Sequence, residues 1–102
     1  MRRITHLINA KSFESTSGNV GPIYNPATGE QTGEVDLASV EEVDLAVESS
    51  KHAFQEWGNV SIARRVKLLH NFRNLVIQNE TEIASRLTEE HGKVSDDARG
   101  EV

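Results

Sequence analysis

The hydrophobic pattern along the chain changes its period at Ser39. Up to residue 38, short runs of apolar and polar residues are typical of β-strands, whereas from Ser39 onward the apolar residues recur with the 3.6-residue spacing of helices. The order of these patterns predicts an α+β fold, with two β-hairpins in residues 1–38, followed by three helices and the start of a fourth in residues 39–102.

The first β-hairpin is predicted from two strand-like runs, residues 4–8 and 11–14, which meet at Asn9-Ala10. A two-residue hairpin turn places both of its central residues at positive φ, and Asn-Gly is the preferred pair for that geometry. Because Ala10 stands in the glycine position, we expect this turn to cost about 1 kcal/mol.

A second hairpin is predicted around the motif Tyr24-Asn25-Pro26-Ala27-Thr28-Gly29-Glu30. Asn25 and Pro26 suit the first two positions of a type I turn, and Gly29 supplies a left-handed residue that gives a longer hairpin loop. Residues 23–24 and 32–35 are the predicted flanking strands. A hairpin of this kind indicates a fold and carries no activity by itself.

The first helix is predicted to begin after Ser39 and to end at Gly58. Ser39 and Glu42 have the spacing of a capping box, in which each side chain satisfies a backbone amide of the other residue. One face of this helix is apolar and comprises Val40, Val43, Ala46, Val47, Ala53, Phe54 and Trp57. The opposite face carries Glu41, Asp44, Glu48 and Lys51, which we interpret as a solvated face rather than a carboxylate site.

The second helix is predicted to start after Ser61 and to end near Asn79. Its apolar positions cover an arc of about 200°, so we expect it to be covered on two sides. Arg65 and Arg73 lie inside this arc, and we expect Arg65 to be partly buried and to pair with a carboxylate of a neighbouring helix. Glu90 is the candidate partner, and a stable Arg65→Met variant would contradict the pairing.

Two shorter helices are predicted at the end of the sequence. Thr81 is the expected N-cap of the first, which stops at Gly92. Ser95 and the two aspartates after it are expected to begin the other, which has room for about two turns before Val102. Isolated helices that short are marginal, and we therefore expect the sequence to stop inside an element of a longer protein.

The composition excludes several kinds of chemistry. The chain has no cysteine, so it cannot form a disulfide, a thiolate metal site or a thiol nucleophile. Its net charge of −5 disfavours a general nucleic-acid surface. No apolar run approaches the roughly 20 residues needed to cross a membrane. Residues 4–8 are too short and polar for the core of a signal peptide, so a cytoplasmic location is predicted.

Three patterns that can mark functional sites are interpreted as structural. Gly18 and Gly21 lack the spacing and the following helix of a phosphate-binding loop. The triplets at residues 59–61 and 79–81 resemble glycosylation sites, but their hydroxyl residues are better explained as helix N-caps. The histidines lack metal-ligand spacing, and they are His6, His52, His70 and His91. No catalytic, cofactor-binding or metal-ligating residue is assigned.

Four motifs, taken in order, resemble the amino-terminal part of the aldehyde dehydrogenases. They are YNPATGE at residues 24–30, VDLAV at 43–47 leading to AFQEW at 53–57, Arg65 with Leu69, and EHGK at 90–93. The resemblance covers essentially all 102 residues. Residues 5–9, 17–19 and 97–102 are most similar to the CoA-acylating methylmalonate-semialdehyde dehydrogenases within that superfamily. Ala10, where those proteins usually have glycine, is a departure that concerns only the first turn.

This resemblance implies a much longer enzyme. Family members bind NAD in a Rossmann-like domain, and a cysteine thiolate attacks the aldehyde before hydride passes to the nicotinamide. In this branch the acyl group passes to coenzyme A, and loss of carbon dioxide gives propionyl-CoA. None of the family's motifs for these steps is present, so NAD and coenzyme A are expected in the full-length parent and neither on this chain. Residues 1–102 would form a single incomplete domain, the outer N-terminal portion of the coenzyme-binding domain.

Two functions stay open at this point. In the first, the chain is a fragment of a homo-oligomeric semialdehyde dehydrogenase, inactive alone, whose partner is the remainder of that polypeptide. In the second, it is an independent helical module that binds a protein through its second helix. An in-frame continuation encoding an active-site cysteine favours the first function. A fragment alone is also expected to self-associate or fold loosely, which a sharp cooperative unfolding of a monomer would contradict.

Overall fold

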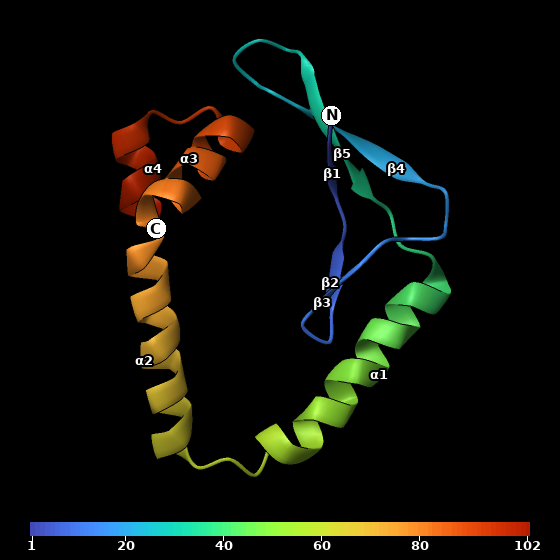
Figure 1. The fold of residues 1–102 in the computed structure, drawn as a ribbon, viewed down its shortest axis with the longest axis vertical. Helices are drawn as coiled ribbons and strands as arrows, with labels where there is room; N and C mark the ends of the chain where they lie inside the picture. Colours follow the sequence, from blue (N-terminus) through green and yellow to red (C-terminus); the bar gives the residue numbers. More distant parts are fainter. The chain divides into compact units, whose positions relative to one another are not determined.

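The computed structural model describes all 102 residues as an α+β fold (Figure 1). The elements follow in the order β1 (Arg2–Ile4), β2 (His6–Ile8), β3 (Lys11–Phe13), β4 (Val20–Tyr24), β5 (Gln31–Asp36), α1 (Val40–Trp57), α2 (Ile62–Gln78), α3 (Glu80–His91) and α4 (Ser95–Glu101). They belong to two compact units. Unit 1 comprises residues 1–23 and 31–59, and unit 2 comprises residues 24–30 and 60–102. The predicted change from strands to helices near Ser39 is confirmed.

The strands of unit 1 form a three-stranded sheet in the order β1-β5-β4 and a separate two-stranded sheet of β2 and β3. In the first sheet β1 runs parallel to β5, with Arg2 opposite Gly33 and Ile4 opposite Val35. The prediction of one strand over residues 4–8 is therefore wrong, because Ile4 and His6 belong to different sheets. Alternation of apolar residues does not reveal a parallel partner some 30 positions away in the sequence.

The close approach of β1 to β5 explains a glycine inside a strand. A Cβ atom built on Gly33 would lie 2.6 Å from the carbonyl oxygen of Arg2. No real side chain tolerates that distance, so only glycine allows β1 to pair here.

The first predicted hairpin is confirmed in the second sheet. His6 pairs with Phe13 and Ile8 with Lys11, and the turn residues Asn9 and Ala10 have φ of 51° and 59°. Positive φ at both central residues is typical of a type I′ turn, whose twist matches the right-handed twist of the strands. Ala10 therefore holds a left-handed conformation that strains a residue with a side chain.

The second predicted hairpin is confirmed between β4 and β5. At the base of its loop the amide of Asn25 donates to the carbonyl of Glu30 at 2.9 Å, and the amide of Gly29 donates to the carbonyl of Asn25 at 2.8 Å. Gly29 has φ of 74°, the left-handed conformation expected for it. The Asn25 side chain also accepts from the amide of Ala27 at 2.9 Å, which stabilises the turn.

Helix α1 has the capping box predicted for it. Ser39 Oγ accepts from the Glu42 amide at 3.2 Å, while Glu42 Oε2 accepts from the Ser39 amide at 2.9 Å. The helix ends at Trp57, and Gly58 is its C-cap. Glu42 is the one buried residue of this helix. The apolar face is largely exposed.

Helix α2 begins after Ser61, whose hydroxyl accepts from the Arg64 amide at 3.3 Å, as predicted. No residue of α2 is buried. Its large apolar side chains are between 44% and 79% exposed, and they are Ile62, Val66, Leu68, Leu69, Phe72, Leu75 and Ile77. Arg65 is partly buried, and its Nε donates to the carbonyl of Val60 at 3.1 Å. The pairing of Arg65 with Glu90 stays a prediction.

The predicted N-cap of α3 is wrong by two residues. Asn79 ends α2 and also caps α3, and its carbonyl already accepts from the amide of Ile83 at 3.0 Å. Because the helical turn starts there, Thr81 lies within the first turn and cannot cap it. At the other end Gly92 is the C-cap with φ of 79°, as predicted.

Ser95 was expected to be the N-cap of α4, but it is the first residue of the helix. The N-cap is Val94, so the helix begins one residue earlier than expected. It packs beside α3 in unit 2 (Figure 1). The two buried apolar side chains of the whole chain lie on these helices: Ala84 on α3 is 3% exposed and Ala98 on α4 is fully buried. Lys93 and Glu101 form an ion pair between the α3–α4 turn and the end of α4.

None of the four helices combines the length and the apolar character required to span a membrane.

Candidate functional site

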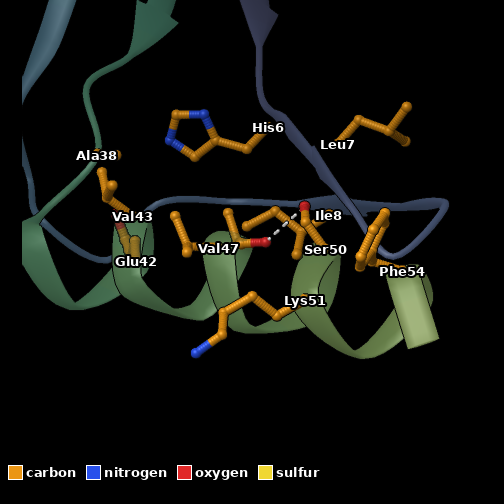
Figure 2. A pocket seen from close by; sticks show the side chains of 11 residues that line it. His6, Leu7, Ile8, Ala38, Glu42, Val43, Val47, Ser50, Lys51 and Phe54 are labelled. Atoms are coloured by element: carbon orange, nitrogen blue, oxygen red, sulfur yellow. Dashed lines mark hydrogen bonds between the residues drawn. The ribbon is translucent and has the colours of Figure 1, made fainter. Parts of the chain in front are cut away.

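A groove of about 730 Å³ lies in unit 1 between the β2–β3 hairpin and α1 (Figure 2). Its apolar lining consists of Leu7, Ile8, Ala38, Val43, Ala46, Val47 and Phe54, and its polar lining of His6, Glu42, Ser50 and Lys51. In Figure 2, His6 and Ile8 of the hairpin lie over the row formed by Val43, Val47 and Phe54. The groove is therefore an apolar surface with few polar groups.

Most of these polar groups already have partners inside unit 1. Ser50 Oγ donates to the carbonyl of Ala46 at 3.0 Å, and Lys51 Nζ donates to Glu48 at 3.2 Å. His6 Nε2 is buried and has no hydrogen-bond partner. Ser50, the hydroxyl of the groove, is thus hydrogen-bonded to a backbone carbonyl and not to a base.

The Glu42 carboxylate joins the loop after β3 to the start of α1. Its Oε2 accepts from Ser15 Oγ at 2.7 Å, and its Oε1 accepts from the Thr16 amide at 2.8 Å and the Thr16 hydroxyl at 3.3 Å. The hydrogen bond from the Ser15 side chain, followed by those from the Ser39 and Thr16 amides, lowers the pKa of Glu42 to about 2. A carboxylate held in this way is a weak base at neutral pH, and its hydrogen bonds connect the loop after β3 to α1.

A second buried carboxylate, Asp36, ties β1 to the end of β5. Arg3 donates to it through Nε at 2.7 Å and through Nη2 at 3.2 Å, and the Ser15 amide donates at 2.8 Å. The hydrogen bond from Arg3 is the main cause that lowers the pKa of Asp36. Ser15 thus contacts both buried carboxylates, its amide binding Asp36 and its hydroxyl binding Glu42.

In unit 2 the loop of residues 24–30 contacts the turn after α3. A Cβ atom built on Gly92 would lie 3.1 Å from Cγ of Pro26. Two of the motifs that carry the family resemblance, residues 24–30 and 90–93, therefore meet in space. Gly92 is suited to this contact because it is left-handed and has no side chain.

The residues considered for phosphate and metal binding are not brought together. Gly18 lies in the loop before β4 with φ of 76°, while Gly21 is inside β4. No group of three or more histidine, aspartate or glutamate side chains is placed to hold a metal ion. The expectation that this chain supplies no catalytic, cofactor or metal residue stays a prediction.

Sequence reasoning missed the roles of Asp36 and Glu42 in tertiary contacts. Glu42 was identified as a capping residue, but the capping spacing says nothing about Ser15 or Thr16. Asp36 carries no local signal, because its partner Arg3 is set by the parallel pairing of β1 with β5.

The model of the aldehyde dehydrogenase family matches residues 13–102 of this chain. The chain belongs to the aldehyde dehydrogenase family. The resemblance stated from its motifs is thereby confirmed, and the match includes the residue 24–30 loop and the Gly92 turn that contact each other.

Two curated proteins that this chain resembles over its whole length are malonate-semialdehyde dehydrogenases. Malonate-semialdehyde dehydrogenase 3 of Geobacillus kaustophilus is 41% identical over 101 residues, which are 99% of this chain and 21% of the relative. Malonate-semialdehyde dehydrogenase of Pseudomonas aeruginosa is 36% identical over 102 residues, covering 100% of this chain and 20% of the relative. The chain therefore spans about a fifth of the length of the relatives it matches.

Solved structures agree with this match. A protein of Sinorhizobium meliloti described as a putative methylmalonate-semialdehyde dehydrogenase, complexed with NAD, superposes with a TM-score of 0.96 at 42% identity, covering 100% of this chain and 21% of that one. The methylmalonate-semialdehyde dehydrogenase of Oceanimonas doudoroffii gives 0.94 at 38% identity, with coverage of 99% and 20%. The observed α+β arrangement is consistent with an N-terminal portion of the aldehyde dehydrogenase fold.

Proposed function

We propose that this chain is the amino-terminal part of an NAD-dependent, CoA-acylating malonate- or methylmalonate-semialdehyde dehydrogenase. In that enzyme residues 1–102 form a single incomplete domain, the outer portion of the coenzyme-binding domain. Their role is to support the fold, and the remainder of the polypeptide supplies the chemistry. The names of the relatives and the fifth of their length that this chain spans support the proposal.

The observation that carries the proposal is the surface of α2. Seven large apolar side chains of this helix are at least 44% exposed, and none of its residues is buried. A helix with a wide apolar arc is stabilised by burial between other elements rather than by water on both flanks. The rest of the dehydrogenase provides such elements.

Three of the four helix N-termini in this chain disfavour a dinucleotide, and the fourth, at α2, has no acidic residue in its first turn. A pyrophosphate binds where free backbone amides lie at the N-terminus of a helix. At α1 the Glu42 carboxylate already accepts from the Ser39 amide, and the first turns of α3 and α4 carry Glu80, Glu82, Asp96 and Asp97, which repel phosphate. The NAD and coenzyme A of the proposed enzyme are therefore assigned to its other residues, and so is the thiolate.

Other features of the parent are proposed from the family resemblance. We expect a cytoplasmic homo-oligomer whose partners include neither nucleic acid nor a membrane. The net charge of −5 on this portion agrees with the absence of a nucleic-acid surface.

The proposal is tested with the 102-residue chain and a shortened relative. The G. kaustophilus enzyme, lacking the segment that matches this chain, is expressed with and without the chain. We expect NAD reduction with malonate semialdehyde and coenzyme A only when both pieces are present, because the α2 surface is then covered. The chain alone is expected to show no saturable binding of NAD and to self-associate.

Two results would contradict this assignment. Oxidation of the semialdehyde by the chain alone would place the chemistry within it. A sharp, cooperative unfolding of a monomer that binds an unrelated protein through α2 would support an independent interaction module instead.

A further inference from the structure

We infer that the groove between the β2–β3 hairpin and α1 is a docking site for an uncharged, apolar segment of the remaining dehydrogenase polypeptide. The inference rests on the proposed function and adds a second, separate contact surface in unit 1, distinct from the α2 surface in unit 2.

The groove has the shape and exposure of a docking surface. Val43 and Val47 lie one helical turn apart on α1 and are 50% and 51% exposed, and Phe54 is 68% exposed. The small residues Ala46 and Ser50 line the groove as well, and they leave room beside these larger side chains. Leu7 of the hairpin, 76% exposed, extends this apolar surface.

The polar groups around the groove define what can occupy it. Ser50 and Lys51 already have partners within α1, and Glu42 is held by Ser15, Thr16 and Ser39. None of these three side chains requires a charged partner from outside, and the buried Nε2 of the fourth polar residue, His6, lacks only a hydrogen-bond partner. An occupant with a charge would lose water without gaining an ion pair, so an apolar segment is favoured.

The length of the relatives favours the rest of the polypeptide over a second copy of the chain as the occupant. The relatives are about five times as long as this chain, so in the proposed enzyme most of the polypeptide lies outside residues 1–102 and is available to cover the groove.

The test uses the absence of cysteine from the chain. The chain is joined to the remainder of the G. kaustophilus enzyme, and single cysteines are introduced as Val47→Cys in the groove and Leu69→Cys on α2. Glu48→Cys is the matched control, because its side chain is 71% exposed on the opposite face of α1. A maleimide labels the folded protein, and peptide mass mapping separates each site from cysteines of the added segment.

We expect Val47→Cys to be labelled roughly tenfold more slowly than Glu48→Cys in the joined protein, because burial limits access of the reagent. Equal labelling of these two sites, with Leu69→Cys protected, would overturn the inference and leave the proposed function standing. Labelling of Leu69→Cys at the control rate would contradict the proposed function itself. In the 102-residue chain, protection of Val47→Cys that grows with protein concentration would assign the groove to a second copy and overturn the inference.

Discussion

The hydroxyl of Ser15 donates to the carboxylate of Glu42 at 2.7 Å, across 27 positions of the sequence. This contact fixes the polar loop after β3 to the first turn of α1. The same serine donates its amide to Asp36, so the loop is held by two buried carboxylates. The groove wall formed by the hairpin is positioned by these contacts.

Acid is expected to weaken unit 1 through Glu42. The pKa of this carboxyl lies at about 2 in the folded chain against an ordinary value of 4.5, so the folded state favours the ionised form. Its contribution to stability is complete above pH 4.5 and is lost as the pH falls from about 4.5 toward 2. Urea unfolding followed by circular dichroism at several pH values measures the effect.

The Glu42→Gln variant is the control for that titration. It should be less stable than the parent at pH 7, and the difference should shrink as the pH falls to about 2, because the parent then loses the same charge. A difference that stays constant with pH would show that Glu42 does not titrate in this range.

Replacing Ala10 by glycine is expected to stabilise the first hairpin by about 1 kcal/mol. Ala10 has φ of 59°, a conformation in which a side chain is strained and glycine is not. The free energy of unfolding, measured with urea, tests this. Ala27→Gly in the other hairpin loop is the matched control, because Ala27 does not have a positive φ and should lose stability from added chain freedom. Equal effects of the two variants would contradict strain at Ala10.

Gly92→Ala is expected to destabilise unit 2 by more than about 1 kcal/mol, because it combines left-handed strain with a contact. The new Cβ would lie 3.1 Å from Pro26, whereas one built on Gly29, with a similar φ of 74°, would meet nothing within 4 Å. Gly29→Ala therefore measures the backbone strain alone. Urea unfolding should rank the Gly92 variant below the Gly29 variant. Addition of Pro26→Ala should recover part of the loss, and no recovery would argue against the contact.

His6→Phe is expected to leave the stability of unit 1 unchanged or to raise it by about 1 kcal/mol. The Nε2 atom of His6 is buried without a partner, and an unpaired polar atom loses its hydrogen bonds to water on folding. Phenylalanine has a similar shape and no such atom. The midpoint of thermal unfolding measures the change, with His52→Phe on the exposed surface of α1 as the control. A marked loss specific to His6 would reveal a hydrogen bond that the ring makes in the folded protein.

The elements whose signals are local could be predicted from the sequence. The capping box of α1, the Ser61 cap of α2, the Gly92 stop and the left-handed Gly29 are each set by residues within about four positions. Thr81 shows the limit of such signals, because two adjacent helices share Asn79 as their boundary and leave no separate cap.

The candidate site depended on contacts that no local pattern contains. The spacing of Ser39 and Glu42 indicated a helix start, but the hydrogen bonds from Ser15 and Thr16 come from a loop 26 to 27 positions away. The apolar face of α1 was predicted correctly as a pattern. That it lines a groove with Ile8, rather than being buried, follows from where the hairpin lies.

The sequence by itself determined the order of strands and helices, the turns, most of the helix ends and the family resemblance, because each depends on short-range patterns of residue type. Only the tertiary structure decided that β1 leaves the first hairpin to pair with β5, that Gly33 must lack a side chain, and that Asp36 and Glu42 are buried. The physical reason is that a parallel strand pair and a buried carboxylate are stabilised by partners distant in the chain, whose identity the local sequence does not encode.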